Sequence, residues 1–199
     1  MLCHFRRLSF VFGLAAVVAG FSAAAAEPLT FSLQRLQAEK AVTVTEKDFD
    51  NKYLLMAVGY TGCPDICPTT LLDIRVAMQT LDNTPAQAAK VQPLFITIDP
   101  EADTLTDISQ YTAFFDPRII GLRAIDYATL DNVVEQLRAS YGYLLDGKPV
   151  LPPNLPKGYT VMHSTFIYLY SPDGQLLDAY PYNTDGKTLA NNILSHIKA

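Results

Sequence analysis

The chain has 199 residues, of which 49% are hydrophobic and 18% are charged, and its formal net charge at pH 7 is −5. This length predicts one domain preceded by a targeting segment, with enough apolar residues to bury a core. The mildly acidic charge argues against a nucleic-acid-binding protein, which would carry a clustered basic face.

Residues 1–26 have the pattern of a secretory signal. Arg6 and Arg7 are followed by the apolar run Leu8–Ala19 and then by four alanines that end at Ala26. A positive segment, an apolar segment and small residues before the cleavage point are the parts of a signal peptide. The alternative is an uncleaved anchor, because the apolar stretch is about long enough to span a bilayer. We expect an exported or periplasmic protein, which touches the inner membrane only if this segment is retained.

Residues 27–199 are predicted to form a single domain, and its first half alternates between strands and helices. Near-continuous apolar runs bounded by turn residues are typical of strands buried on both faces. The expected elements are short strands over Phe31–Phe49, a buried strand over Lys52–Tyr60, a helix over Pro68–Leu81 and a second buried strand over Val91–Asp99.

The second half of the domain continues this alternation and ends in a hairpin and a helix. The expected elements are a helix over Thr104–Phe115 with Thr104 as its N-cap, a short strand over Ile119–Ala124, a helix over Tyr127–Ser140, a proline-rich surface loop over Leu145–Gly158, hairpin strands over Ser164–Tyr170 and Gln175–Tyr180, and a closing helix over Asp185–Ile197. This order predicts an α/β sandwich with a mixed central sheet.

The pair Cys63 and Cys67 lies between a predicted buried strand and a predicted helix. Pro68 follows at once, at the position that proline favours at a helix start. Residues four apart at a helix start face the same side, and the helix N-terminus is expected to lower the pKa of a thiol. A strand, a CxxxC turn and a helix in this order are thioredoxin-like, which predicts a three-layer sandwich.

The cysteine pair could bind a soft metal ion, exchange electrons as a disulfide, or do both. A structural bridge between Cys63 and Cys67 would close a very short loop and would stabilise the fold little. We therefore expect the pair to act in chemistry, either as metal ligands or as a redox pair.

A third ligand would turn the two thiols into a specific metal site. Beyond the predicted signal only two histidines remain, His163 and His196. His163 precedes the late hairpin, which in a thioredoxin-like fold begins opposite the cysteine helix. Two thiolates and an imidazole suit copper, as Cu(I) or Cu(II), and zinc with a bound water could use the same ligands. His196 is expected to be a solvated residue near the end of the last helix, where its charge suits the helix dipole.

Two residues beside these ligands are expected to have structural roles. The thioether of Met162 could assist Cu(I). Because neighbours in a strand point to opposite faces, however, Met162 is predicted to pack inward. Asp65 is predicted to cap the start of the cysteine helix with its carboxylate.

Three segments resemble, in order and rough spacing, the Sco/SenC family of copper-delivery proteins. The segments are Gly59–Pro68 with both cysteines, Thr97–Thr104, and His163-Ser164 followed by an apolar strand and the turn Ser171–Gly174. The similarity runs from about residue 31 to the C-terminus. It implies a thioredoxin-like fold and a copper site formed by Cys63, Cys67 and His163.

The same resemblance implies copper delivery to the dinuclear copper centre of cytochrome c oxidase, with thiol reductase activity in some members. The partner would be an oxidase subunit or another copper acceptor. Three positions depart from the family pattern. Gly62 stands where many members have histidine or asparagine, Ala102 replaces a usual arginine, and Met162 replaces a common acidic residue. None of these departures removes a ligand, so they affect the choice of client more than the chemistry.

The leading hypothesis from the sequence is a copper metallochaperone rather than an enzyme. The alternative is an exported thiol–disulfide oxidoreductase, in which Cys63 attacks a substrate disulfide and Cys67 resolves the mixed disulfide. His163 separates the two hypotheses, since an oxidoreductase does not strictly need it. A peroxidase on the same fold is disfavoured, because no peroxidatic cysteine motif with a partnering arginine is evident.

Overall fold

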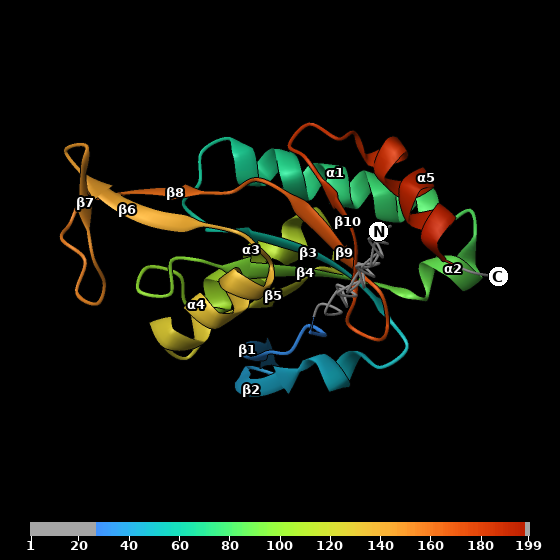
Figure 1. The fold of residues 1–199 in the computed structure, drawn as a ribbon, viewed down its shortest axis with the longest axis horizontal. Coiled ribbons are helices and arrows are strands. Elements are labelled where there is room, and N and C mark those ends of the chain that lie inside the picture. Colours follow the sequence, from blue (N-terminus) through green and yellow to red (C-terminus); the bar gives the residue numbers. More distant parts are fainter. Residues whose placement is uncertain (1–26, 198–199) are drawn as a thin grey trace, which may run out of the picture.

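The computed structural model describes residues 27–197, in which strands alternate with helices (Figure 1). The predicted signal or anchor over residues 1–26 lies outside the described residues, as do the last two residues of the predicted domain. Within residues 27–197, no helix is both long enough and apolar enough to cross a membrane.

A mixed five-stranded sheet forms the centre of the fold, in the strand order β10-β9-β3-β4-β5. The strands are β3 (Tyr53–Gly59), β4 (Val91–Thr97), β5 (Ile120–Leu122), β9 (Ile167–Tyr170) and β10 (Leu176–Tyr180). β3, β4 and β5 are parallel, whereas β9 runs antiparallel to β3 and to β10. The predicted mixed central sheet is confirmed.

Helices and a hairpin cover the two faces of this sheet. One face carries α1 (Ile66–Leu81), α3 (Leu105–Phe115) and α5 (Gly186–His196), and the other carries α4 (Tyr127–Gln136) and the hairpin of β1 (Ser32–Gln37) and β2 (Lys40–Thr45). Side chains alternate along β3, so that Leu55 belongs to the first core and Met56 to the second. This is the predicted three-layer arrangement.

A separate three-stranded sheet, in the order β7-β6-β8, projects beyond the central sheet (Figure 1). It consists of β6 (Tyr141–Leu145), β7 (Lys148–Val150) and β8 (Thr160–His163), and we call residues 141–163 the arm. The predicted loop over Leu145–Gly158 is therefore wrong in its first part. Pro149 did not prevent pairing because β7 is an edge strand, where a missing N–H is tolerated.

The ends of several helices differ from the prediction. α1 begins at Ile66 instead of Pro68, which places Cys67 inside the first helical turn. α4 ends at Gln136 instead of Ser140, and Arg138 adopts a left-handed φ of 53° that no α-helix continues through. The predicted N-cap of α3 is confirmed, since the hydroxyl of Thr104 accepts the Asp107 N–H at 3.1 Å. Two short helices, η1 (Glu46–Phe49) and α2 (Pro85–Ala88), were not predicted.

Candidate metal centre

The two cysteines lie where β3 passes into α1. Cys63 precedes the helix, and its backbone N–H donates to the Tyr60 carbonyl at 3.3 Å. Cys67 is in the first turn of α1, and its backbone N–H donates to the sulfur of Cys63 at 3.3 Å. One of the free N–H groups at the helix start is therefore satisfied by the sulfur of Cys63.

Both cysteines are buried and unbridged, with 9% of Cys63 and 1% of Cys67 exposed. The sulfur of Cys67 is close to the end of β3. A Cβ atom added at Gly59 would lie 2.7 Å from this sulfur and 2.8 Å from the ring of Phe95. Gly59 is therefore needed at this position, because any side chain would compete with the sulfur for the same space.

His163 reaches the cysteines from the end of the arm. It is the last residue of β8, paired with Tyr141 of β6, and it lies 96 residues from Cys67 in the sequence. Its Nε2 is 3.6 Å from the sulfur of Cys67, and its Nδ1 is 2.8 Å from the carbonyl oxygen of Ser164. A carbonyl can only accept, so Nδ1 carries the proton in the neutral ring and Nε2 keeps its lone pair for a metal.

The three donor atoms form a compact group. The two sulfurs and one imidazole nitrogen all lie within 4.8 Å of one another. Two metal–sulfur bonds of about 2.3 Å span at most about 4.6 Å, so small side-chain adjustments would close the group around one ion. Two soft sulfurs and an imidazole fit copper or zinc and do not fit magnesium or calcium, which require oxygen ligands.

Burial sets the protonation of this site. It raises the pKa of the Cys67 thiol, with the hydrogen bond to Cys63 adding to the effect, and it lowers the pKa of His163. The expectation that the helix N-terminus lowers the thiol pKa is therefore wrong for Cys67, because desolvation outweighs the helix dipole. At neutral pH the site holds a neutral imidazole and a protonated Cys67, and metal binding must displace the thiol proton.

Tyr60 lines the site between the cysteines and the histidine. Its ring meets the His163 ring edge-on, with centroids 6.1 Å apart. Burial, followed by the nearby Cys63 and Cys67, raises the pKa of Tyr60 to about 12. The phenol therefore stays protonated and borders the same hollow as Cys63 and His163.

Two sequence expectations about residues beside the ligands do not hold, and a third, about His196, holds in part. Met162 does not pack inward, because 53% of it is exposed. Its cross-strand partner is Gly142, where an added Cβ would meet open space. Asp65 stands at the N-cap position of α1 but makes no capping hydrogen bond with its side chain. His196 lies in the last turn of α5 and outside the three-residue group, as expected, but it is half-buried and lies 3.6 Å from Asp178.

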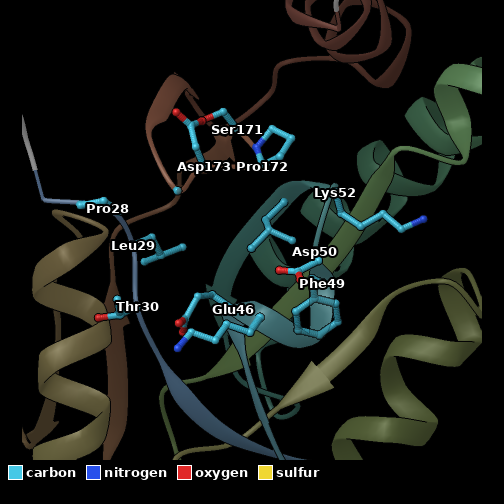
Figure 2. A pocket seen from close by; sticks show the side chains of 13 residues that line it. Pro28, Leu29, Thr30, Glu46, Phe49, Asp50, Lys52, Ser171, Pro172 and Asp173 are labelled. Carbon is cyan, nitrogen blue, oxygen red and sulfur yellow. The ribbon is translucent and has the colours of Figure 1, made fainter.

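Another hollow in the structure has different chemistry. It lies between the start of the described chain, η1 and the turn before β10, and it is shown in Figure 2. Charged side chains of both signs line it, including Glu46, Asp50 and Lys52, but no cysteine or histidine does. It therefore offers none of the soft ligands of the site at Cys63.

A family model described as SCO1/SenC matches residues 25–198 of this chain. The chain belongs to the SCO1/SenC family. The resemblance that the three sequence segments indicated is thereby confirmed.

Curated relatives of the SCO1/SenC family cover most of this chain. Protein SCO2 homolog, mitochondrial, of Danio rerio is 35% identical over 154 residues, which are 77% of this chain and 52% of that protein. Protein SCO1, mitochondrial, of Saccharomyces cerevisiae is 34% identical over 157 residues, which are 78% of this chain and 50% of that protein. The matched region thus spans about half the length of these relatives.

Solved structures of SCO1/SenC members share the fold. Arabidopsis thaliana ScoI with copper bound has a TM-score of 0.71 and 29% identity, over 84% of this chain and 96% of that one. Yeast Sco1 with copper bound has a TM-score of 0.71 and 32% identity, over 86% and 88% of the two chains. These neighbours confirm the thioredoxin-like fold class.

Two acidic residues that sequence reasoning did not single out hold the arm in place. Tyr159 donates its hydroxyl to both carboxylate oxygens of Asp99, at 2.7 and 2.8 Å. The carboxylate of Glu101 accepts the backbone N–H groups of Asn154 and Leu155, at 2.9 and 3.0 Å. We call Asp99 and Glu101 the clasp. The signal for them was their place directly after the buried strand β4, where a loop must carry polar contacts.

Proposed function

We propose that this protein binds one copper ion through Cys63, Cys67 and His163 and passes it to an acceptor during cytochrome c oxidase assembly. The observation that carries the proposal is the convergence of two buried sulfurs and one imidazole nitrogen within 4.8 Å. Copper is bound in the solved structures of Arabidopsis thaliana ScoI and yeast Sco1, which favours copper over zinc for this donor set.

The residues of the chain define how such a carrier holds and releases its cargo. Copper binding removes the thiol proton of Cys67, and the neutral His163 offers Nε2 without prior deprotonation. The cysteines are fixed in the core, whereas His163 is carried by the arm. Release would follow when ligands of the acceptor replace those of this protein. This exchange would begin in the hollow that Cys63 and His163 border.

The test is an anaerobic copper titration of the reduced protein beside His163→Ala. We expect one copper per wild-type chain, a sulfur-to-metal charge-transfer band for bound Cu(II), and weaker binding in the variant. A parallel zinc titration compares the two metals directly. A chain that takes up no copper, or that binds zinc more tightly than Cu(I), would contradict the proposal.

Thiol–disulfide exchange is a second candidate, and the geometry around Cys63 favours it. Cys63 is the more accessible sulfur and accepts the Cys67 N–H, which stabilises negative charge on it. In this reaction the Cys63 thiolate attacks a substrate disulfide and expels one substrate thiol. Cys67 then attacks the mixed disulfide, expels the second thiol and leaves the pair oxidised. Equal reductase rates in wild type and His163→Ala, with no copper uptake by either, would favour this candidate.

We also propose that the protein works after export, as the predicted signal or anchor at residues 1–26 indicates. Mass spectrometry of the protein from a periplasmic fraction tests this. A chain that begins at Glu27 supports cleavage, a full-length chain in the membrane fraction supports the anchor, and a full-length chain in the cytosol contradicts export.

A further inference from the structure

Asp103 is a buried carboxylate that the proposed copper chemistry does not use. It lies in the loop between β4 and α3, and only 3% of it is exposed. Its Oδ2 accepts the hydroxyl of Thr97, at the end of β4, at 2.5 Å. A carboxylate in this position requires donors, because burial of an uncompensated charge is costly.

The other donors to Asp103 come from the turn that presents Cys63. The Thr61 N–H donates to Oδ2 at 3.0 Å, and the Thr61 hydroxyl donates to Oδ1 at 2.5 Å. Thr61 stands two residues before Cys63, and the Cys63 N–H closes the same turn onto Tyr60. Hydrogen bonds to a carboxylate are stronger than neutral ones, so Asp103 holds the turn to the end of the central sheet.

The charge of Asp103 also lies close to the turn that carries Cys63. Its carboxylate accepts from Thr61, two residues before Cys63, and is only 3% exposed, so little water screens its charge. Charges in such apolar surroundings interact more strongly than in water. A negative charge near a bound ion stabilises a higher ionic charge more than a lower one.

We propose that Asp103 is a positioning residue of the metal centre, which fastens the Thr61–Cys63 turn and favours Cu(II) over Cu(I) through its negative charge. This inference rests on the proposed copper binding and adds a preference of oxidation state to it. It assigns the preference to a residue of the β4–α3 loop that binds no copper itself.

The main test is Asp103→Asn, which keeps the size of the side chain and removes its charge. The potential of the bound Cu(II)/Cu(I) couple is measured anaerobically against redox dyes. We expect the ratio of Cu(II) to Cu(I) affinity to fall about tenfold, within the range for residues behind the ligands, which raises the potential by about 59 mV for one electron. A potential equal to that of the wild type overturns the inference.

Asp116→Asn is the matched control. Asp116 is also a buried carboxylate, 4% exposed, but it pairs with Arg118 at 2.7 Å, after the end of α3. Its replacement should lower stability and leave the copper potential unchanged. An equal shift of the potential in both variants would mean that any lost buried charge has this effect, and would overturn the assignment to Asp103.

Thr61→Val separates position from charge and replaces the main test if Asp103→Asn does not fold. It keeps the carboxylate and removes one donor. In the copper-free protein we expect faster hydrogen exchange at the amides of residues 61–63, and in the Cu(II) form a shifted charge-transfer band. Unchanged exchange and an unchanged band overturn the positioning role. If wild type itself binds no copper, the proposed function fails, whereas normal wild-type binding with silent variants removes this inference alone.

Discussion

The two sides of the metal centre are built differently. The cysteine side belongs to the core, because Cys67 is 1% exposed and its sulfur lies against Gly59 and Phe95. The histidine side belongs to the arm, a small separate sheet that is held to the body in part by the clasp. The core half fixes the two sulfurs by close packing, whereas the arm half brings His163 to them from outside the central sheet. This division fits the proposed role, in which the protein binds copper and passes it on.

The largest difference between the two sides should appear when a core ligand is replaced. Cys67→Ser places a hydroxyl in an apolar position and removes a sulfur ligand. We expect copper affinity to fall more than about 100-fold, beyond the usual effect of changes behind the ligands. The copper-free protein should lose about 1–3 kcal/mol of stability, as expected for a buried polar group without a partner. Copper titration and chemical denaturation measure the two losses.

Cys63→Ser is the control for this variant, because Cys63 lies at the rim of the site. It should lose copper binding to a similar extent but lose less stability than Cys67→Ser. Equal loss of stability in both variants would contradict the deeper burial of Cys67 as the cause of its larger effect.

Replacement of the arm ligand should affect binding without affecting the fold. His163 is half-buried, and its Nδ1 contacts only the backbone of the next residue. We expect His163→Ala to lower copper affinity clearly, though less than Cys67→Ser does, because both sulfurs remain, and to change stability by no more than about 0.5 kcal/mol. Formation of the Cys63–Cys67 disulfide should proceed at the wild-type rate. Equal loss of copper binding and disulfide formation would mean that His163 organises the whole turn.

The pH dependence of binding should come from the cysteine side. The pKa of Cys67 is raised and that of His163 is lowered by burial. Above the ordinary histidine pKa of about 6.5, the imidazole is already neutral and binding releases protons from thiols only. Affinity should therefore rise about tenfold per pH unit for each proton released, from pH 7 upward to the raised pKa of the thiol.

Calorimetry in buffers of different ionisation enthalpy counts these protons. His163→Ala should release the same number as the wild type above pH 7. Binding without proton release would contradict the protonated state of Cys67.

The raised pKa of Cys67 also has a consequence for stability. The folded state retains the thiol proton more strongly than the unfolded state does. The stabilising contribution of this proton is therefore complete below the ordinary thiol pKa of about 8.5 and is lost as the pH rises through the higher pKa of the folded state.

The smallest effect should come from the clasp. Glu101→Ala removes the acceptor for the N–H groups of Asn154 and Leu155. Each of these exposed hydrogen bonds is worth about 0.5–1.5 kcal/mol, so the arm should open more often and copper affinity should fall only a few-fold. Glu135→Ala, at an exposed position on α4, is the matched control. In a His163→Ala background the effect of Glu101→Ala should disappear, and its persistence would show that the clasp acts on the cysteines instead.

The sequence predicted the central sheet and the place of the two cysteines after a buried strand because these signals are local. β3 is a near-continuous apolar run, and the cysteines follow it within one turn. The arm was missed in part because its pairing of Tyr141 with His163 joins residues that are far apart in the sequence. Asp103 was missed because its role depends on Thr61 and Thr97, which only the folded chain brings together. The thiol pKa was mispredicted because burial is a tertiary property.

Gly59 limits the substitutions that the site can accept, both in evolution and in protein engineering. The space that a side chain would occupy at the end of β3 is already filled by the sulfur of Cys67 and the ring of Phe95. Even alanine at this position would force one of these neighbours to shift. Attempts to tune the protein for a different ion should therefore leave this strand end alone and vary the arm, where the surroundings are open enough to accept new side chains.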